Sequence, residues 1–150
     1  MKTKILIPIF TLILSGCVPG SASKVICEGK LNGKPIVETM VVDGDKVIET
    51  EMVITTDLRN KGEYGVQEIE STFIEKSRSY SIVNGAQYTY KIEKDKGIET
   101  IILDFEKVSL DRTYNINLLD SLDSDFTDIN VKTEKYKING GTCKTKRGIF

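Results

Sequence analysis

The chain has 150 residues, with 21 basic and 22 acidic side chains, a formal net charge of −1 and no histidine. This balance excludes the strongly basic surface that nucleic-acid binding requires, so no nucleic-acid partner is expected. The lack of histidine excludes the Ser-His-Asp and Cys-His catalytic arrangements and the usual zinc sites.

The chain begins with a pattern typical of a secretory signal peptide. Lys2 and Lys4 form a short basic start, and residues 5–14 are almost wholly apolar. This run has about ten residues, whereas a membrane-spanning helix needs roughly 20. We therefore expect residues 1–16 to be a cleaved signal peptide rather than a permanent membrane helix.

The signal ends in Leu14-Ser15-Gly16-Cys17, which resembles the bacterial lipobox. In proteins with this motif the cysteine thiol carries a lipid, including acyl chains such as palmitate, and cleavage occurs just before it. We expect cleavage between Gly16 and Cys17 and lipidation of Cys17. Two or three acyl chains anchor a protein stably, so the expected location is outside the cytoplasm on the bacterial cell membrane. The alternative is an unlipidated signal with a chance cysteine.

Two further cysteines, Cys27 and Cys143, remain after Cys17. An even pair in an oxidising compartment forms a disulfide by default, and this one would join the two ends of the domain. Cys27 shares a strand face with Val25, so it is expected to point into the core. The alternative is two reduced thiols.

Two segments are expected to remain after cleavage. Residues 17–23 comprise the lipidated cysteine and a flexible tether, because they are small, contain Pro and Gly and lack an apolar period. Residues 24–150 are then expected to form a single globular α+β domain.

The first third of this domain alternates apolar and polar residues and predicts an antiparallel three-stranded meander. The predicted strands are 24–31, 36–42 and 46–56, with turns at Asn32-Gly33 and Asp43-Gly44. In the third strand, Ile48, Met52 and Ile54 are expected on one face.

The later elements alternate between helical and strand periods. Helical spacing predicts a helix over about residues 65–79, with Val66, Ile69, Phe73, Ser77 and Tyr80 on its apolar face. Strands are predicted over 88–93 and 98–108, followed by an irregular stretch and a short helix over 131–139, capped by Asn130 and Gly140. The expected fold is an antiparallel sheet of about five strands, built from a meander and a hairpin, with one helix in the middle and a short C-terminal helix.

One segment of the sequence echoes another. Residues 45–50, Asp-Lys-Val-Ile-Glu-Thr, recur as residues 95–100, Asp-Lys-Gly-Ile-Glu-Thr. Both span a turn and the start of a returning strand, and a predicted helix follows each hairpin. Either the hairpin-and-helix unit is duplicated or the match is a coincidence. The most apolar faces of the two returning strands do not superpose under this offset.

Several short motifs together resemble a known family. They are the lipobox, Leu31-Asn32-Gly33, Gly44-Asp45-Lys46-Val47 and the strand at 102–108. With them the chain resembles the YehR-like family of small bacterial lipoproteins. The resemblance implies an α+β fold with antiparallel strands, and it implies no activity, because the family is uncharacterised. The chain departs from the family pattern in having Cys27 and Cys143.

The acidic residues do not predict a catalytic or metal site. Asp104 and Glu106 lie two apart on one strand and are expected on its solvated face. The stretch 120–128, read from Asp123 to Glu134, superficially follows an EF-hand loop, but Asp128 stands where that loop needs glycine. An acidic surface loop is expected instead, with no metal and no cofactor. The six tyrosines are expected mainly in the core or at its rim.

Three functional readings follow. The favoured one is a non-catalytic binding or interaction module, tethered to the membrane through Cys17, with an unknown protein or small-molecule partner. The alternative is an envelope-protective inhibitor of a lysozyme-like enzyme, because the chain resembles, in size and in its cysteine pair, the small lipoproteins that inhibit lysozyme. The third is an enzyme. The basic residues after position 131 either form a solvated face or contact anionic lipid beside the anchor.

Overall fold

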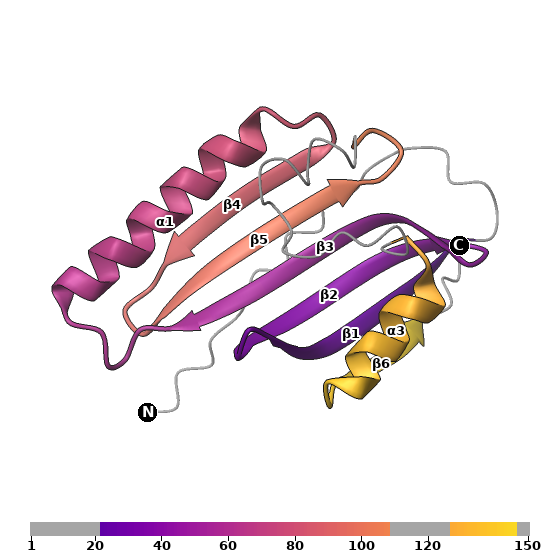
Figure 1. Cartoon of the computed structure of the whole chain (residues 1–150), viewed down its shortest axis with the longest axis horizontal. Helices are drawn as coiled ribbons and strands as arrows, with labels where there is room; N and C mark the ends of the chain where they lie inside the picture. Colours follow the sequence, from indigo (N-terminus) through magenta and orange to yellow (C-terminus); the bar gives the residue numbers. More distant parts are fainter. Residues whose placement is uncertain (1–21, 109–126, 147–150) are drawn as a thin grey trace, which may run out of the picture.

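The computed structural model describes residues 22–108 and 127–146, which form one antiparallel sheet with two helices on one face (Figure 1). The strands are β1 (Ser23–Leu31), β2 (Lys34–Asp43), β3 (Lys46–Asp57), β4 (Ala86–Ile92), β5 (Lys96–Asp104) and β6 (Thr142–Lys146). The helices are α1 (Glu63–Ser81) and α3 (Ile129–Ile138). The six strands lie in the order β4-β5-β3-β2-β1-β6.

Strands β1, β2 and β3 form an antiparallel meander at the centre of the sheet. The turn between β1 and β2 consists of Asn32 and Gly33, both with positive φ (50° and 77°), which is the conformation that tight hairpins require. Gly44, with φ of 60°, has the same role between β2 and β3.

The expectation of about five strands is wrong, because a sixth strand, β6, pairs with the edge of β1. Residues 142–146 read Thr-Cys-Lys-Thr-Lys, and only Cys143 is even half-buried. A strand that buries one side chain shows no apolar alternation, so periodicity does not reveal it. The sequence signal for β6 is Cys143 itself, which lies opposite Cys27 in the register.

Both helices differ from the predicted bounds at their ends. Helix α1 is longer than 65–79 and buries Phe73 and Tyr80, two members of its predicted face. Helix α3 begins earlier than predicted, because the N-cap is Asp128 and not Asn130; the Asp128 side chain accepts hydrogen bonds from two backbone N–H groups of the first turn. Within the described residues, neither helix is long and apolar enough to cross a membrane.

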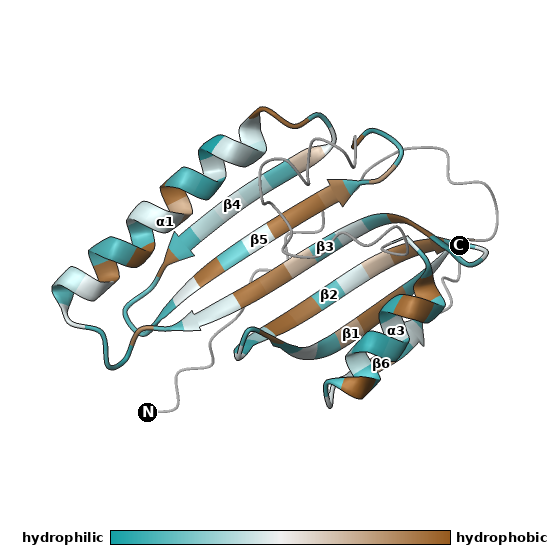
Figure 2. Cartoon of the chain, in the orientation of Figure 1, coloured by the Kyte–Doolittle hydropathy of each residue, from teal (hydrophilic) through white to brown (hydrophobic). Residues whose placement is uncertain are grey.

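The core lies between the helices and the sheet face that they cover, in two clusters. The larger cluster joins α1 to β3, β4 and β5 and includes Tyr80, Met52 and Leu103. The smaller one lies towards α3 and includes Cys27 and Met40. Figure 2 shows the apolar residues of the central strands as brown segments that alternate with paler ones.

The two hairpins that carry the sequence echo have turns at matching positions. In the first, Asp43 pairs with Lys46; in the second, the N–H of Glu93 donates to the carbonyl of Lys96 at 2.8 Å. The repeated Asp-Lys pair thus occupies the same place in both hairpins.

Beyond these turns the hairpins differ because β3 contains a bulge. Val42 pairs with Val47, whereas Val41 pairs with Glu49, so Ile48 is an extra residue in β3. The extra residue shifts the alternation of inward and outward side chains in β3 by one position. Val47, Thr50 and Met52 therefore face inward, whereas Ile48 does not. The prediction that Ile48 shares a face with Met52 is therefore wrong.

Candidate functional site: the corner of α3, β1 and β6

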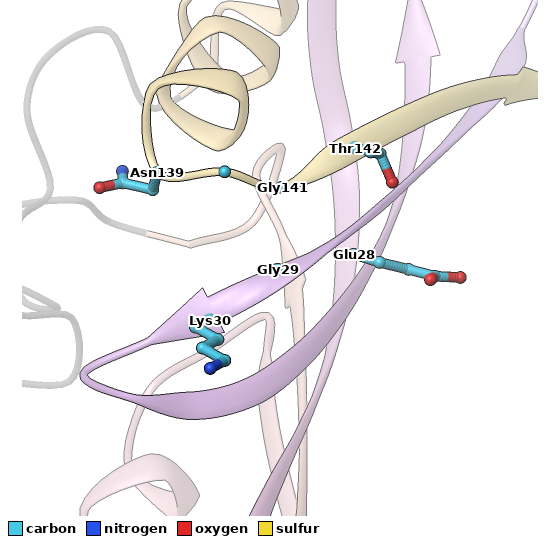
Figure 3. Close-up of a pocket in the computed structure, with 7 residues that line it drawn as sticks. Glu28, Gly29, Lys30, Asn139, Gly141 and Thr142 are labelled. Carbon is cyan, nitrogen blue, oxygen red and sulfur yellow. The ribbon is translucent and has the colours of Figure 1, made fainter.

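An open groove lies where helix α3 turns back into β6 (Figure 3). Its lining comes from two segments, Glu28–Lys30 of β1 and Asn139–Thr142, and its volume is about 450 Å³. Gly140 has a φ of 75°, which lets the chain leave the helix sharply. A Cβ atom on Gly141 would lie 2.6 Å from the carbonyl oxygen of Glu28, so only glycine fits this close approach.

The groove exposes a part of β1 that β6 does not cover. Pairing between these strands ends at Glu28 and Thr142, so within the described residues the three β1 residues after Glu28 have no strand partner on this side. Two apolar side chains near the groove are exposed, Leu31 and Ile138. The groove therefore offers a ligand β1 backbone without a strand partner on this side and nearby apolar surface. The side chains of Glu28 and Lys30 flank Gly29, which faces Tyr136, so they lie on the other face of the sheet.

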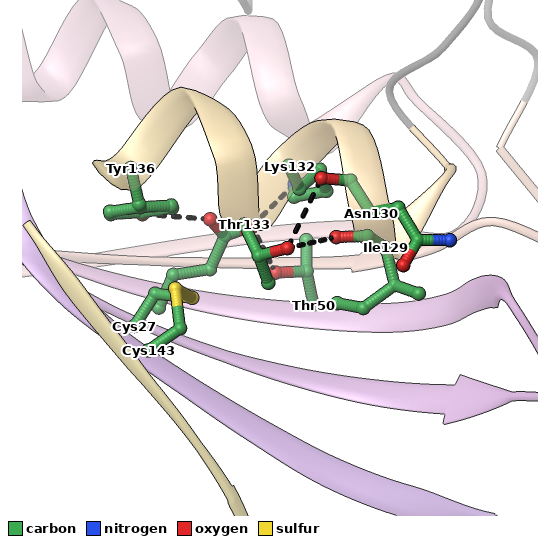
Figure 4. Close-up of a disulfide and its surroundings, with 9 residues drawn as sticks. Cys27, Thr50, Ile129, Asn130, Lys132, Thr133, Tyr136 and Cys143 are labelled. Atoms are coloured by element: carbon green, nitrogen blue, oxygen red, sulfur yellow. Dashed lines mark hydrogen bonds and ion pairs between the residues drawn. A yellow bond between two sulfur atoms is a disulfide. The ribbon is translucent and has the colours of Figure 1, made fainter. Parts of the chain in front are cut away.

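The disulfide between Cys27 and Cys143 fixes this corner (Figure 4). The two cysteines are direct partners in the β1–β6 register, with their Cα atoms 4.0 Å apart. Cys27 is fully buried, as its predicted inward position requires. The bond links residues 116 positions apart and holds β6 against β1.

A buried carboxylate, Glu38 of β2, connects helix α3 to the sheet. Lys132 of α3 forms an ion pair with Glu38 at 2.6 Å, and the two side chains are only 6% and 4% exposed. The Tyr136 hydroxyl donates to the other carboxylate oxygen at 2.8 Å, and the Thr50 hydroxyl donates at 2.7 Å. This network gives the charge of Glu38 three partners and holds the inner face of α3.

A second buried carboxylate, Glu99, lies beneath α1. Lys76 of α1 forms an ion pair with it at 2.6 Å, and the Tyr88 hydroxyl donates to the same oxygen at 2.8 Å. Tyr80 stacks on Tyr88, with ring centroids 5.2 Å apart. The Glu99 side chain is 1% exposed and its Oε2 has no hydrogen-bond partner among the described residues. Both buried acids thus join helices to the sheet and are closed to solvent.

Burial raises the pKa of three tyrosines, Tyr80, Tyr88 and Tyr136, above the usual value of 10.0, and the adjacent carboxylates raise it further. Burial also lowers the pKa of Lys132, an effect that Glu38 opposes. The hydroxyls therefore stay protonated above the ordinary tyrosine pKa, and those of Tyr88 and Tyr136 continue to donate to Glu99 and Glu38.

Alkaline pH is expected to unfold the protein cooperatively. Above about pH 10 the unfolded tyrosines lose protons that the folded ones keep, so the free energy of unfolding falls as pH rises. Lys132, with its lowered pKa, acts in the opposite direction, but one group opposes three. Tyrosinate absorbance and circular dichroism should therefore change together. Gradual ionisation of all tyrosines without loss of circular dichroism would contradict this expectation.

The predicted lipidation site and the acidic residues considered as metal ligands are not brought together in the described residues. Residues 1–21, including Gly16 and Cys17, and residues 120–126 of the acidic stretch lie outside the described residues. Asp128 caps α3, and Asp104 pairs with Lys107, so neither is a free ligand. Among residues 22–108 and 127–146, no group of three acidic or sulfur side chains is arranged to hold a metal ion.

Sequence reasoning missed the network beneath α3. The available signal was the position of Glu38 between Ile36 and Met40 on the inward face of β2, where a polar residue breaks the apolar alternation. A second signal was the spacing of Lys132 and Tyr136, four positions apart on one helix face.

Two solved structures have the same architecture. The NMR structure of the E. coli YehR protein matches with a TM-score of 0.64 and 21% identity, covering 82% of this chain and 90% of that one. This chain has the YehR fold. An NMR structure of a protein from Streptococcus pneumoniae TIGR4 also matches, with a TM-score of 0.60 and 11% identity, covering 96% of this chain and 97% of that one.

No protein-family model and no curated protein matches the chain. At these identities the two structures establish the YehR fold and leave the function to be argued from this chain's own residues.

Proposed function

We propose that this YehR-fold protein is a lipid-anchored, extracytoplasmic binding module without catalytic activity. The observation that carries the proposal is the motif Leu14–Cys17 directly after the apolar run 5–14. The disulfide agrees with it, because such bonds persist in oxidising compartments outside the cytoplasm.

The groove at the corner of α3, β1 and β6 is the proposed contact surface for the partner. Among the described residues it combines a β1 segment that has no strand partner on this side with the exposed side chains of Glu28, Lys30 and Asn139, which point in different directions (Figure 3). The buried acids Glu38 and Glu99 are already engaged by lysines, so they support the fold rather than acid–base chemistry. No contact among the described residues favours lysozyme inhibition over another binding role.

Lipidation is expected to depend on Cys17. Protein extracted from membranes should lack residues 1–16 and carry acyl mass on Cys17, whereas Cys17→Ala should carry none and leave the membrane fraction. Intact-mass spectrometry measures both. The matched control is the double variant Cys27→Ala/Cys143→Ala, which should remain lipidated. Wild-type protein from membranes without acyl mass would overturn the proposed anchor.

Partner contact is expected at the groove. A photo-crosslinking amino acid at Asn139, which is exposed at the groove, should give a discrete crosslinked product in intact cells. The control is the same amino acid at Lys61, an exposed loop residue before α1. Equal products from both positions, or none from Asn139, would contradict the assignment of the groove.

A further inference from the structure

The direction of β1 indicates which end of the domain lies near the membrane. The strand begins at Ser23, six positions after Cys17. Six extended residues span at most about 20 Å, so a lipid on Cys17 keeps the start of β1 within that distance of the bilayer. This step rests on the proposed function.

Three lysines gather at this end of the sheet: Lys24 of β1 and Lys144 and Lys146 of β6. Lys24 lies directly opposite Lys146 in the register, and Lys144 lies opposite Ile26 on the same sheet face. All three side chains are exposed, and the described residues form no ion pair with them. We call these three residues the basic corner; the disulfide between Cys27 and Cys143 holds its two strands together.

Edge protection accounts for only part of this placement, and Lys24 also interacts with Glu49 across β2. Like charges directly opposite on neighbouring strands are destabilising, and Lys24 faces Lys146 in this way. Lysines on an edge strand protect it from pairing with other chains, which explains Lys144 and Lys146 on β6. Lys24 lies on an interior strand, where this explanation does not apply.

Acidic residues at the same end of the sheet lie on other strands. Asp43 and Asp45 belong to the turn between β2 and β3, and Glu49 lies on β3, two strands from Lys24. The positive charge therefore lies along the β1–β6 edge and borders on the acids of the central strands, where the charge of Lys24 opposes the rise that burial gives to the pKa of Glu49.

We propose that the basic corner rests on anionic lipid head groups beside the anchor, with the β6 edge nearest the membrane. The groove begins at Glu28 and lies at the other end of the paired β1–β6 segment, roughly 15–20 Å along β1 from Lys24. In this orientation the groove faces away from the bilayer, open to a partner.

The test uses the mature lipidated protein in vesicles of phosphatidylcholine, with or without about 30% phosphatidylglycerol. A fluorescent donor is placed at Thr145, which is exposed beside the basic corner, or at Asn139 in the groove, with an acceptor on the lipid. On anionic vesicles, energy transfer from Thr145 should exceed that from Asn139. The difference should shrink on neutral vesicles and in about 1 M salt, where charges are screened beyond about 3 Å.

The variant Lys24→Gln/Lys144→Gln/Lys146→Gln should lose the difference on anionic vesicles. Each lysine near an anionic surface favours contact roughly fivefold, so losing three should reduce the ratio of docked to undocked protein roughly hundredfold. The matched control, Lys34→Gln/Lys61→Gln/Lys94→Gln, removes the same charge at the opposite end of the sheet and should behave as wild type. Thermal melting confirms that both variants fold.

The outcomes separate the two proposals. Protein that inserts into both kinds of vesicle but shows the same energy transfer on each, or that responds equally to both triple variants, would overturn the orientation alone. Protein that binds neither kind of vesicle would overturn the lipid anchor and the orientation together.

Discussion

Glu38→Leu is expected to destabilise the fold by about 3–5 kcal/mol, because it leaves Lys132 buried without this carboxylate. The Tyr136 and Thr50 hydroxyls lose their acceptor in the same step. Chemical denaturation followed by circular dichroism measures the loss as a lower midpoint with an unchanged slope.

Two controls separate the buried pair from a general effect of losing an acid. The double variant Glu38→Leu/Lys132→Met removes both charges and should regain most of the stability, because a well-packed apolar pair replaces a buried ion pair at little cost. Glu51→Leu removes an exposed acid from the neighbouring strand β3 and should change stability by less than about 0.5 kcal/mol. A Glu38→Leu loss no larger than that of Glu51→Leu would contradict a structural role for the network.

The strands that can be predicted from this sequence are those with one buried and one solvated face. In β2 and β5 apolar side chains recur at every second position on the inward face, interrupted in each strand by one buried acid, so both strands are visible in the sequence. Strand β6 buries no complete side chain, and the bulge at Ile48 leaves no mark in composition. The existence of β6 and the position of the bulge both depend on pairing with another strand. The local sequence pattern therefore cannot predict them.

The corner of α3, β1 and β6 was predictable only through its cysteines. An even cysteine pair in an expected oxidising compartment indicates a disulfide, and that bond places the C-terminal segment beside β1. The groove depends on where β6 begins relative to β1 and on the close approach of Gly141 to Glu28, which only the folded chain defines. Glutamate and lysine are rarely buried, so composition gives no reason to expect the pair beneath α3.

The two buried acids show how the hairpins and helices are combined. Helix α1 follows β3 in the chain, yet its Lys76 reaches Glu99 of β5. Helix α3 follows β5, yet its Lys132 reaches Glu38 of β2. If the first unit is β2, β3 and α1 and the second is β4, β5 and α3, the helix of each unit contacts the hairpin of the other. Two hairpin-and-helix units that exchange their helices would have this arrangement. The matching turns of the sequence echo agree with this arrangement, and the bulge at Ile48 explains why the strand faces do not superpose.

Reduction of the disulfide between Cys27 and Cys143 is expected to lower the melting temperature without abolishing the fold. The bond closes a separation of 116 residues, for which the chain-entropy model gives an upper limit of roughly 4.7 kcal/mol. The larger core cluster does not require the bond, because strands β2 to β5 pair with one another independently of it. Calorimetry with and without reductant measures the shift.

The loss should be confined largely to β6, whose strand pairing is with β1 alone. After reduction, amide hydrogens of residues 142–146 should exchange faster, while those of β3 and β5 keep their protection. The unreduced Cys27→Ala/Cys143→Ala variant should behave like the reduced wild type, which separates loss of the bond from other effects of the reductant. Equal acceleration across the whole sheet would show that the bond supports the entire fold. Detachment of β6 would also remove Lys144 and Lys146 from Lys24, so reduction and the lysine variants should have the same effect on anionic vesicles.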